Sequence, residues 1–130
     1  ILDKLEMKPK EVATIVTAIG NHDEGTGVAV NPIAAALILA DKTDVRRSRV
    51  RNTDVATFDI HDRVNHSVIG SVLQIDDAKK EIVLSLEIDT ECGSIMDFFE
   101  IFLHRMNMCR KAAEKLNLEF GLVINGDRMI

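Results

Sequence analysis

Large apolar residues recur with two different periods along this chain, and the change of period limits the folds open to it. Between Val12 and Ile19 the apolar residues have the 3.6-residue spacing of an amphipathic helix. Between Ile82 and Ile88 every second residue is Ile or Leu, the pattern of a strand with one buried face. The sequence therefore predicts an α+β chain with helices first and a sheet later.

Proline and asparagine mark where the first helices begin. Pro9 suits the first turn of a helix, where its missing N–H loses no partner, and this helix is expected to end near Gly20. Asn31 and Pro32 are typical of the N-cap and first position of a second helix. Residues 33–40 are apolar on every side of that helix, so we expect it to be buried all round.

The second part of the chain is predicted to form a ββαβ unit. Residues 67–75 pair as a hairpin with the strand at 82–89, and residues 118–124 form a third strand. Ser94 and Asp97 have the spacing of a capping box, and the long helix that they begin packs on an antiparallel or mixed sheet. We divide the chain into three parts: a helical segment at 1–51, a connecting loop at 52–66 and a ββαβ subdomain at 67–130.

Charge and aromatic content argue against nucleic acid as a partner. The 130 residues include 16 Lys and Arg against 21 Asp and Glu, a net charge of −5, whereas nucleic-acid binding needs a basic surface. Trp and Tyr are absent, which leaves only five Phe for base stacking. The longest apolar run, at 33–40, is far shorter than the ~20 residues that span a bilayer, so no membrane is expected either.

The cysteine content bears on the cellular location of the protein, and the first residue bears on whether the chain is part of a longer protein. Cys92 and Cys109 are too few for a disulfide framework, which favours a reducing, cytoplasmic location. The chain begins at Ile1 within a helical pattern, and we expect it to be the C-terminal piece of a longer protein.

Asp41 is the first candidate functional residue. It ends the apolar run at 33–40, and Ile38 and Val45 lie on its helical face. A carboxylate there is costly unless a cation pairs with it or a metal binds it. Periodicity leaves three interpretations open: a metal ligand, a buried salt bridge to an arginine, or the point where the helix emerges.

His22 is the second candidate, because it projects near the apolar face of the first helix, one turn beyond its end. Neutral imidazole is a common ligand for transition metals. Asp23 beside it is a candidate acid, base or orienting group. A histidine at a helix end also serves as a C-cap or a core residue, and the spacing leaves both interpretations open.

Five of the sixteen basic residues fall within ten positions after Asp41. Helical geometry places only some of them on one face, so most are expected to be solvated. Lys42, Arg46 and Arg47 are the candidates to contact a phosphate, because arginine binds phosphate through two parallel hydrogen bonds. A clustered positive patch on an acidic protein favours a small anionic molecule over a polymer.

Two segments carry a resemblance to a known family: IGNHDEGTG at 19–27 and NPIAAALILADKTDVRRSRV at 31–50. Together they resemble the later part of an HD-domain metal-dependent phosphohydrolase. That family holds a divalent metal on a helical bundle with an early His, a His-Asp doublet and a late Asp on a final core helix. The resemblance covers about residues 10–51. It implies that Asp41 is the late aspartate ligand and that His22 is a second ligand or a substrate contact.

The resemblance also implies an activity, the hydrolysis of a phosphate ester or nucleotide. A divalent ion held by His and Asp side chains lowers the pKa of a bound water and polarises a phosphoryl oxygen. In this interpretation His22 and Asp23 are the catalytic candidates of the chain. Arg46 and Arg47, with Lys42, would contact the phosphate of a small phosphorylated substrate.

The sequence departs from the family pattern before His22, where no early His or His-Asp doublet occurs. Metal-dependent hydrolysis is therefore expected of the intact parent, and metal binding by this chain alone is expected to be weak. The letters His61-Asp62 spell a doublet but follow Asp41, outside the predicted bundle. We interpret them as a polar turn in which Asp62 caps a short helix. The alternative is a loop, with Arg63, that closes over a ligand.

A different class of function stays open, a non-catalytic ligand-binding or dimerisation module. A small sheet backed by one helix is an architecture that such modules use. Its free edge strand offers unpaired N–H and C=O groups to a second copy of the chain. A translation start near Ile1 would favour this alternative over the phosphohydrolase.

Overall fold

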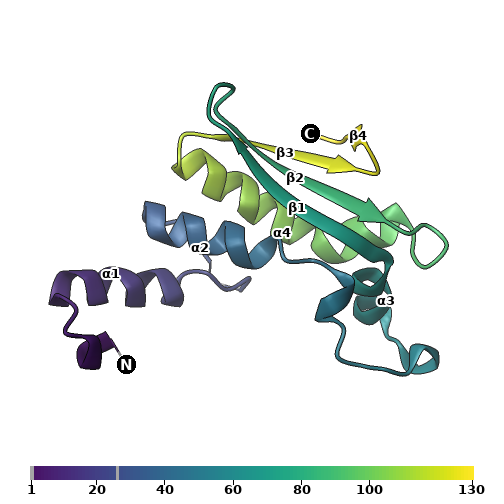
Figure 1. Cartoon of the computed structure of the whole chain (residues 1–130), viewed down its shortest axis with the longest axis horizontal. Helices are drawn as coiled ribbons and strands as arrows, with labels where there is room; N and C mark the ends of the chain where they lie inside the picture. Colours follow the sequence, from purple (N-terminus) through teal and green to yellow (C-terminus); the bar gives the residue numbers. More distant parts are fainter. Residues whose placement is uncertain (1, 26) are drawn as a thin grey trace.

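In the computed structural model, which describes residues 2–25 and 27–130, a helical segment leads into a mixed sheet backed by one long helix (Figure 1). The α-helices are α1 (Pro9–Gly20), α2 (Pro32–Lys42), α3 (Ile60–Ser67) and α4 (Ile95–Lys115). The strands are β1 (Val68–Asp76), β2 (Glu81–Ile88), β3 (Glu119–Ile124) and β4 (Asp127–Arg128). Short 3-10 helices are η1 (Leu2–Leu5), η2 (Arg47–Arg49) and η3 (Val55–Thr57). The predicted α+β organisation is confirmed.

Local sequence fixes the starts of three helices where they were predicted. Helix α1 begins at Pro9 and α2 at Pro32, and the side chain of Asn31 accepts a hydrogen bond from the backbone N–H of Ala34 at 2.8 Å. At α4 the Ser94 hydroxyl accepts from the N–H of Asp97 at 3.0 Å, and the Asp97 carboxylate accepts from the N–H of Ser94 at 3.2 Å. Each contact satisfies a backbone donor that the first turn leaves free.

The sheet has the order β1-β2-β3-β4. Strands β1 and β2 form the predicted antiparallel hairpin, whereas β2 and β3 run parallel because α4 carries the chain back between them. The short strand β4 was not predicted. It follows a two-residue turn at Asn125 and Gly126, whose φ angles of 51° and 89° are those of a hairpin turn with both central residues left-handed.

One hydrophobic core joins the helical segment to the sheet. The helix-facing side of the sheet presents Ile82, Leu84 and Leu122 to α4, whose Phe102 is 1% exposed. Ile38 of α2 belongs to the same core, because α2 packs on α4. Figure 1 shows the sheet, α4, α2 and α1 as successive layers, with the other face of the sheet uncovered by any described helix.

The segment at 52–66, predicted to be a connecting loop, contains η3 and most of α3. The N-cap of α3 is Asp59, whose carboxylate accepts from the N–H of Asp62 at 2.8 Å. Asp62 therefore lies in the first turn, and the prediction that it caps the helix is wrong. In the part of the chain that the structure describes, no helix is long and apolar enough to cross a membrane.

Candidate functional site

His22 lies in the loop that follows α1. The Nδ1 atom of His22 lies 2.6 Å from the carbonyl oxygen of Ile19, a distance that fits an Nδ1–H donor. This bond holds the ring against the end of α1, as the C-cap interpretation expected, and leaves Nε2 free of that contact. A backbone carbonyl on one ring nitrogen is also the contact that orients a metal-ligating histidine.

Asp41 is close enough to His22 for their charges to interact. Partial burial of Asp41 would raise its pKa, but its hydrogen bond to Lys42 and the charge of Lys42 oppose that effect. The charges of His22 and Arg105 lower it further, so the pKa of this carboxyl lies below its usual value. The structure thus places the two residues that the resemblance singled out within range of each other's charge.

Lys42, and not Asp41, is the buried charge at this end of α2. Lys42 is 4% exposed, and its Nζ lies 2.5 Å from the Asp41 carboxylate and 4.0 Å from the Glu24 carboxylate. The Asp41 side chain is 39% exposed. The cation that pairs with Asp41 is therefore its neighbour along the chain and not an arginine, the partner that the buried salt-bridge interpretation expected.

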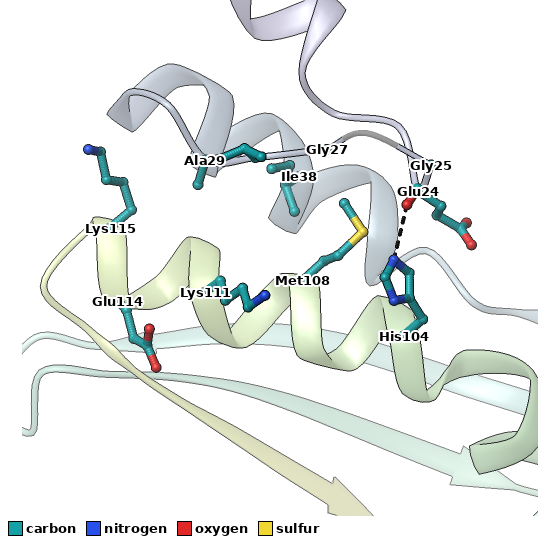
Figure 2. A pocket seen from close by; sticks show the side chains of 11 residues that line it. Glu24, Gly25, Gly27, Ala29, Ile38, His104, Met108, Lys111, Glu114 and Lys115 are labelled. Atoms are coloured by element: carbon teal, nitrogen blue, oxygen red, sulfur yellow. Dashed lines mark hydrogen bonds between the residues drawn. The ribbon is translucent and has the colours of Figure 1, made fainter.

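Glu24 fixes the loop to α4. Its carboxylate lies 2.6 Å from Nε of Arg105, and its carbonyl oxygen lies 3.0 Å from Nε2 of His104 (Figure 2). Neither contact was predicted from the sequence, because each joins residues about eighty positions apart. The available signal was the spacing of His104, Met108, Lys111 and Lys115, which places them along one face of α4.

Beside Glu24 and His104, a cleft of about 600 Å³ opens between the loop that follows α1, helix α2 and helix α4 (Figure 2). Ile38 and Met108, both buried, form its floor together with Ala29. Lys111 and Lys115 line it from α4. Gly27 packs closely against this floor, because a methyl group added there would collide with the Asp23 carbonyl and the Met108 side chain.

Asp23, Arg46 and Arg47 make local contacts. The Asp23 carboxylate accepts from the N–H of Glu24 at 2.8 Å and is exposed. Arg46 donates to Asp44 at 2.8 Å. Arg47 donates to the His66 carbonyl at 2.5 Å and has Asp89 at 3.6 Å. These contacts draw Arg46 and Arg47 toward different partners, while Lys42 is buried, so the three basic candidates do not form one patch.

His61, Asp62 and Arg63 lie on α3, which contacts η2, α4 and β1. The carboxylate of Asp62 accepts from Asn52 at 3.5 Å, and Arg63 donates to the Phe58 carbonyl at 3.2 Å. The side-chain hydrogen bonds of Asp62 and Arg63 thus run to the segment at 52–59, and the His61 carbonyl accepts from Asn65 within α3; none of these contacts reaches His22 or Asp41.

The chemistry of the donors tests whether this chain alone fits a metal ion. His22 offers one imidazole nitrogen and Asp41 one carboxylate, which a nearby ammonium already neutralises. Within residues 2–25 and 27–130 no group of three or more His, Cys, Asp or Glu side chains is placed to hold a metal. The described residues therefore make an incomplete site, with two donors where a catalytic metal in proteins usually has three or more.

Comparisons with protein-family models, with curated proteins and with solved structures find no match to this chain.

Proposed function

We propose that this chain forms part of a metal-dependent phosphohydrolase in which His22 and Asp41 are two of the metal ligands. The observation that supports the proposal most is that His22, after the end of α1, acts electrostatically on the carboxylate of Asp41, near the end of α2. The bond from His22 to the Ile19 carbonyl adds support, because it leaves Nε2 as the ligating atom.

The remaining ligands belong, in this proposal, to a longer protein that includes this chain. A divalent ion bound there would activate a water molecule and polarise a phosphoryl oxygen of a phosphate ester or nucleotide. Because Lys42 is buried, contact with the substrate phosphate is left to Arg46 and Arg47, whose side chains are 54% and 43% exposed.

The test uses the longest protein encoded in the reading frame that contains this chain. Hydrolysis of p-nitrophenyl phosphate is measured with added divalent metals, and bound metal is measured by elemental analysis. His22→Ala and Asp41→Asn should each abolish hydrolysis and lower the metal content. Asp44→Asn is the matched control, since Asp44 follows the same helix but pairs with Arg46 and Arg49.

Loss of stability has to be separated from loss of a ligand, because Asp41 also neutralises buried Lys42. The double variant Asp41→Asn with Lys42→Met removes both charges together. Under the proposal this double variant is folded and still inactive. Hydrolysis that survives in the double variant, or a reading frame without an upstream His and His-Asp doublet, contradicts the proposal.

A second candidate function, a dimerisation module, rests on strand β1. This strand lies at the edge of the sheet, nine residues long, and it has no charged residue before Asp76. Ile69, Val72 and Ile75 on it are 48%, 53% and 63% exposed. A long, uncharged edge strand with exposed apolar side chains is a template for pairing with another chain.

Sedimentation equilibrium of the 130-residue chain tests this candidate. A dimer that Val72→Lys dissociates supports pairing through β1. The control is Val55→Lys on η3, where the valine is 65% exposed and remote from the strand in sequence. A monomer at every concentration, or a dimer that withstands Val72→Lys, rules out this interface.

A further inference from the structure

The cleft beside Glu24 combines an apolar floor with two lysines on one wall. Its floor consists of Met108, which is 6% exposed, Ile38, which is 1% exposed, and Ala29. Its volume of about 600 Å³ falls within the range of roughly 300–1,000 Å³ typical of small-molecule sites. The space is therefore large enough for one or two aromatic rings.

The positive wall comes from α4. Lys111 and Lys115 are four residues apart, which places two like charges on the same face of the helix. Neither forms an ion pair with any side chain that the structure describes. Figure 2 shows Lys115 extending toward α2, with Glu114 turned to the opposite side of α4. The repulsion between the two lysines is thus left for a ligand to relieve.

The one other acidic side chain that lines the cleft does not oppose them. Glu24 is held by Arg105 at 2.6 Å, so its charge is already compensated. The backbone carbonyl oxygen of Glu24 already accepts a hydrogen bond from Nε2 of His104. An anion that enters the cleft therefore meets two lysines that form no ion pair with described residues, at the end near Lys115, and apolar side chains beneath.

We propose that this cleft binds a small amphipathic anion, with its apolar body on Met108 and Ile38 and its acidic group between Lys111 and Lys115. The anionic group is a sulfonate, carboxylate or phosphate, since a lysine ammonium binds each of them as a point charge. The site needs no metal and uses neither His22 nor Asp41. It is thus independent of the proposed hydrolysis.

The experiment titrates the 130-residue chain with naphthalene-2-sulfonate, which a phosphohydrolase cannot hydrolyse. Amide and methyl shifts in NMR spectra locate the site, and calorimetry gives the affinity. Naphthalene-2-sulfonamide supplies the same rings without the charge, and inorganic sulfate supplies the charge without the rings. Binding of the sulfonate should shift resonances of Met108, Lys111 and Val28, and both comparison molecules should bind at least about tenfold more weakly.

Paired variants separate the two lysines from general electrostatic attraction. Lys111→Gln combined with Lys115→Gln should weaken sulfonate binding at least about tenfold. Lys10→Gln combined with Arg110→Gln removes two exposed cations that do not line the cleft, and it should leave the affinity within about twofold. Circular dichroism checks that both variants keep the fold.

Three results would overturn the proposal. The first is equal affinity for the sulfonate and the sulfonamide, which would mean that the lysines are not used. The second is an equal loss of sulfonate affinity in the two double variants, which would mean that binding depends on the net charge of the protein and not on Lys111 and Lys115. The third is the absence of shifts at Met108, Lys111 and Val28 when the sulfonate is in large excess.

Discussion

The ammonium group of Lys42 lies 2.5 Å from the carboxylate of Asp41, so two residues adjacent in sequence form an ion pair at the end of α2. The lysine side chain is 5% exposed and the aspartate 39%. Removal of the aspartate leaves the buried cation with Glu24, at 4.0 Å, as its one ion-pair partner among the described residues.

Asp41→Asn should therefore destabilise the chain by about 2–3 kcal/mol. This is less than the ~3–5 kcal/mol for breaking a fully buried pair, because the carboxylate is partly solvated and Glu24 remains. Replacing both residues, Asp41→Asn with Lys42→Met, should recover most of the loss. Urea unfolding followed by circular dichroism measures both. If the unfolding free energy of Asp41→Asn lies within about 0.5 kcal/mol of the wild-type value, the ion pair does not contribute to the stability of the fold.

The same carboxylate gives the protein an acid-sensitive contribution to stability. The pKa of Asp41 in the folded protein lies below the ordinary 3.8, although burial opposes the shift, because Lys42 binds the ionised form. Between these two values the unfolded chain binds more protons, so stability rises with pH there. The contribution of Asp41 is thus complete above about pH 4 and is lost as the pH falls through the lowered pKa. Unfolding free energies of wild type and Asp41→Asn should therefore converge on acidification. A difference between the two unfolding free energies that stays constant as the pH falls would contradict the lowered pKa of Asp41.

Phe102 and Leu103 are neighbours on α4 with opposite environments, 1% and 53% exposed. Phe102→Ala removes a ring from the core between α4 and the sheet and should cost ~3–5 kcal/mol. Leu103→Ala, as the control on the same helix, should cost under about 1 kcal/mol. Chemical denaturation measures both. Similar costs for the two variants would mean that the inward face of α4 is misassigned.

The two cysteines should differ in their reaction with iodoacetamide. The hydrogen bond to Asp89 raises the pKa of exposed Cys92, whereas burial raises the pKa of Cys109 to about 12. At about pH 8 we expect slow labelling of Cys92 and none of Cys109 until the protein unfolds, because the thiolate is the reactive form. Asp89→Asn should accelerate labelling of Cys92 alone, as mass spectrometry of the two peptides would report. Unchanged labelling in that variant would disprove the role of Asp89.

Local signals were enough to predict much of this fold. The N-cap at Asn31 and the capping box at Ser94 involve residues three positions apart, so the sequence contains both partners. The alternation at 82–88 predicted the buried face of β2, because strand geometry has a period of two. Strand β4, with two residues, is too short to have a period. Most of the eight residues of helix α3 are polar, so the sequence has no apolar stripe there from which a helix could be predicted.

The candidate site was harder to predict, because it depends on contacts across the fold. Periodicity marked Asp41 as an unusual residue, yet the buried member of the pair is Lys42. A lysine is buried at that position only because Asp41 and the loop carboxylate of Glu24 surround its ammonium group. The cleft likewise depends on the loop lying against α4, and the contacts of Glu24 with His104 and Arg105 place it there.

Helix α1 packs chiefly on α2, so we expect α1 to unfold locally more readily than the rest of the fold. Val16 and Ile19 are 58% and 55% exposed, so opening α1 exposes little additional apolar surface. Its amide protons should exchange with solvent well before those of α4 and β2, whose side chains share the single core. Because His22 is held by the last turn of α1, each such opening also releases the imidazole from its position near Asp41. The lifetime of the folded α1 therefore limits how long the imidazole keeps its hydrogen bond to Ile19 and its electrostatic effect on Asp41.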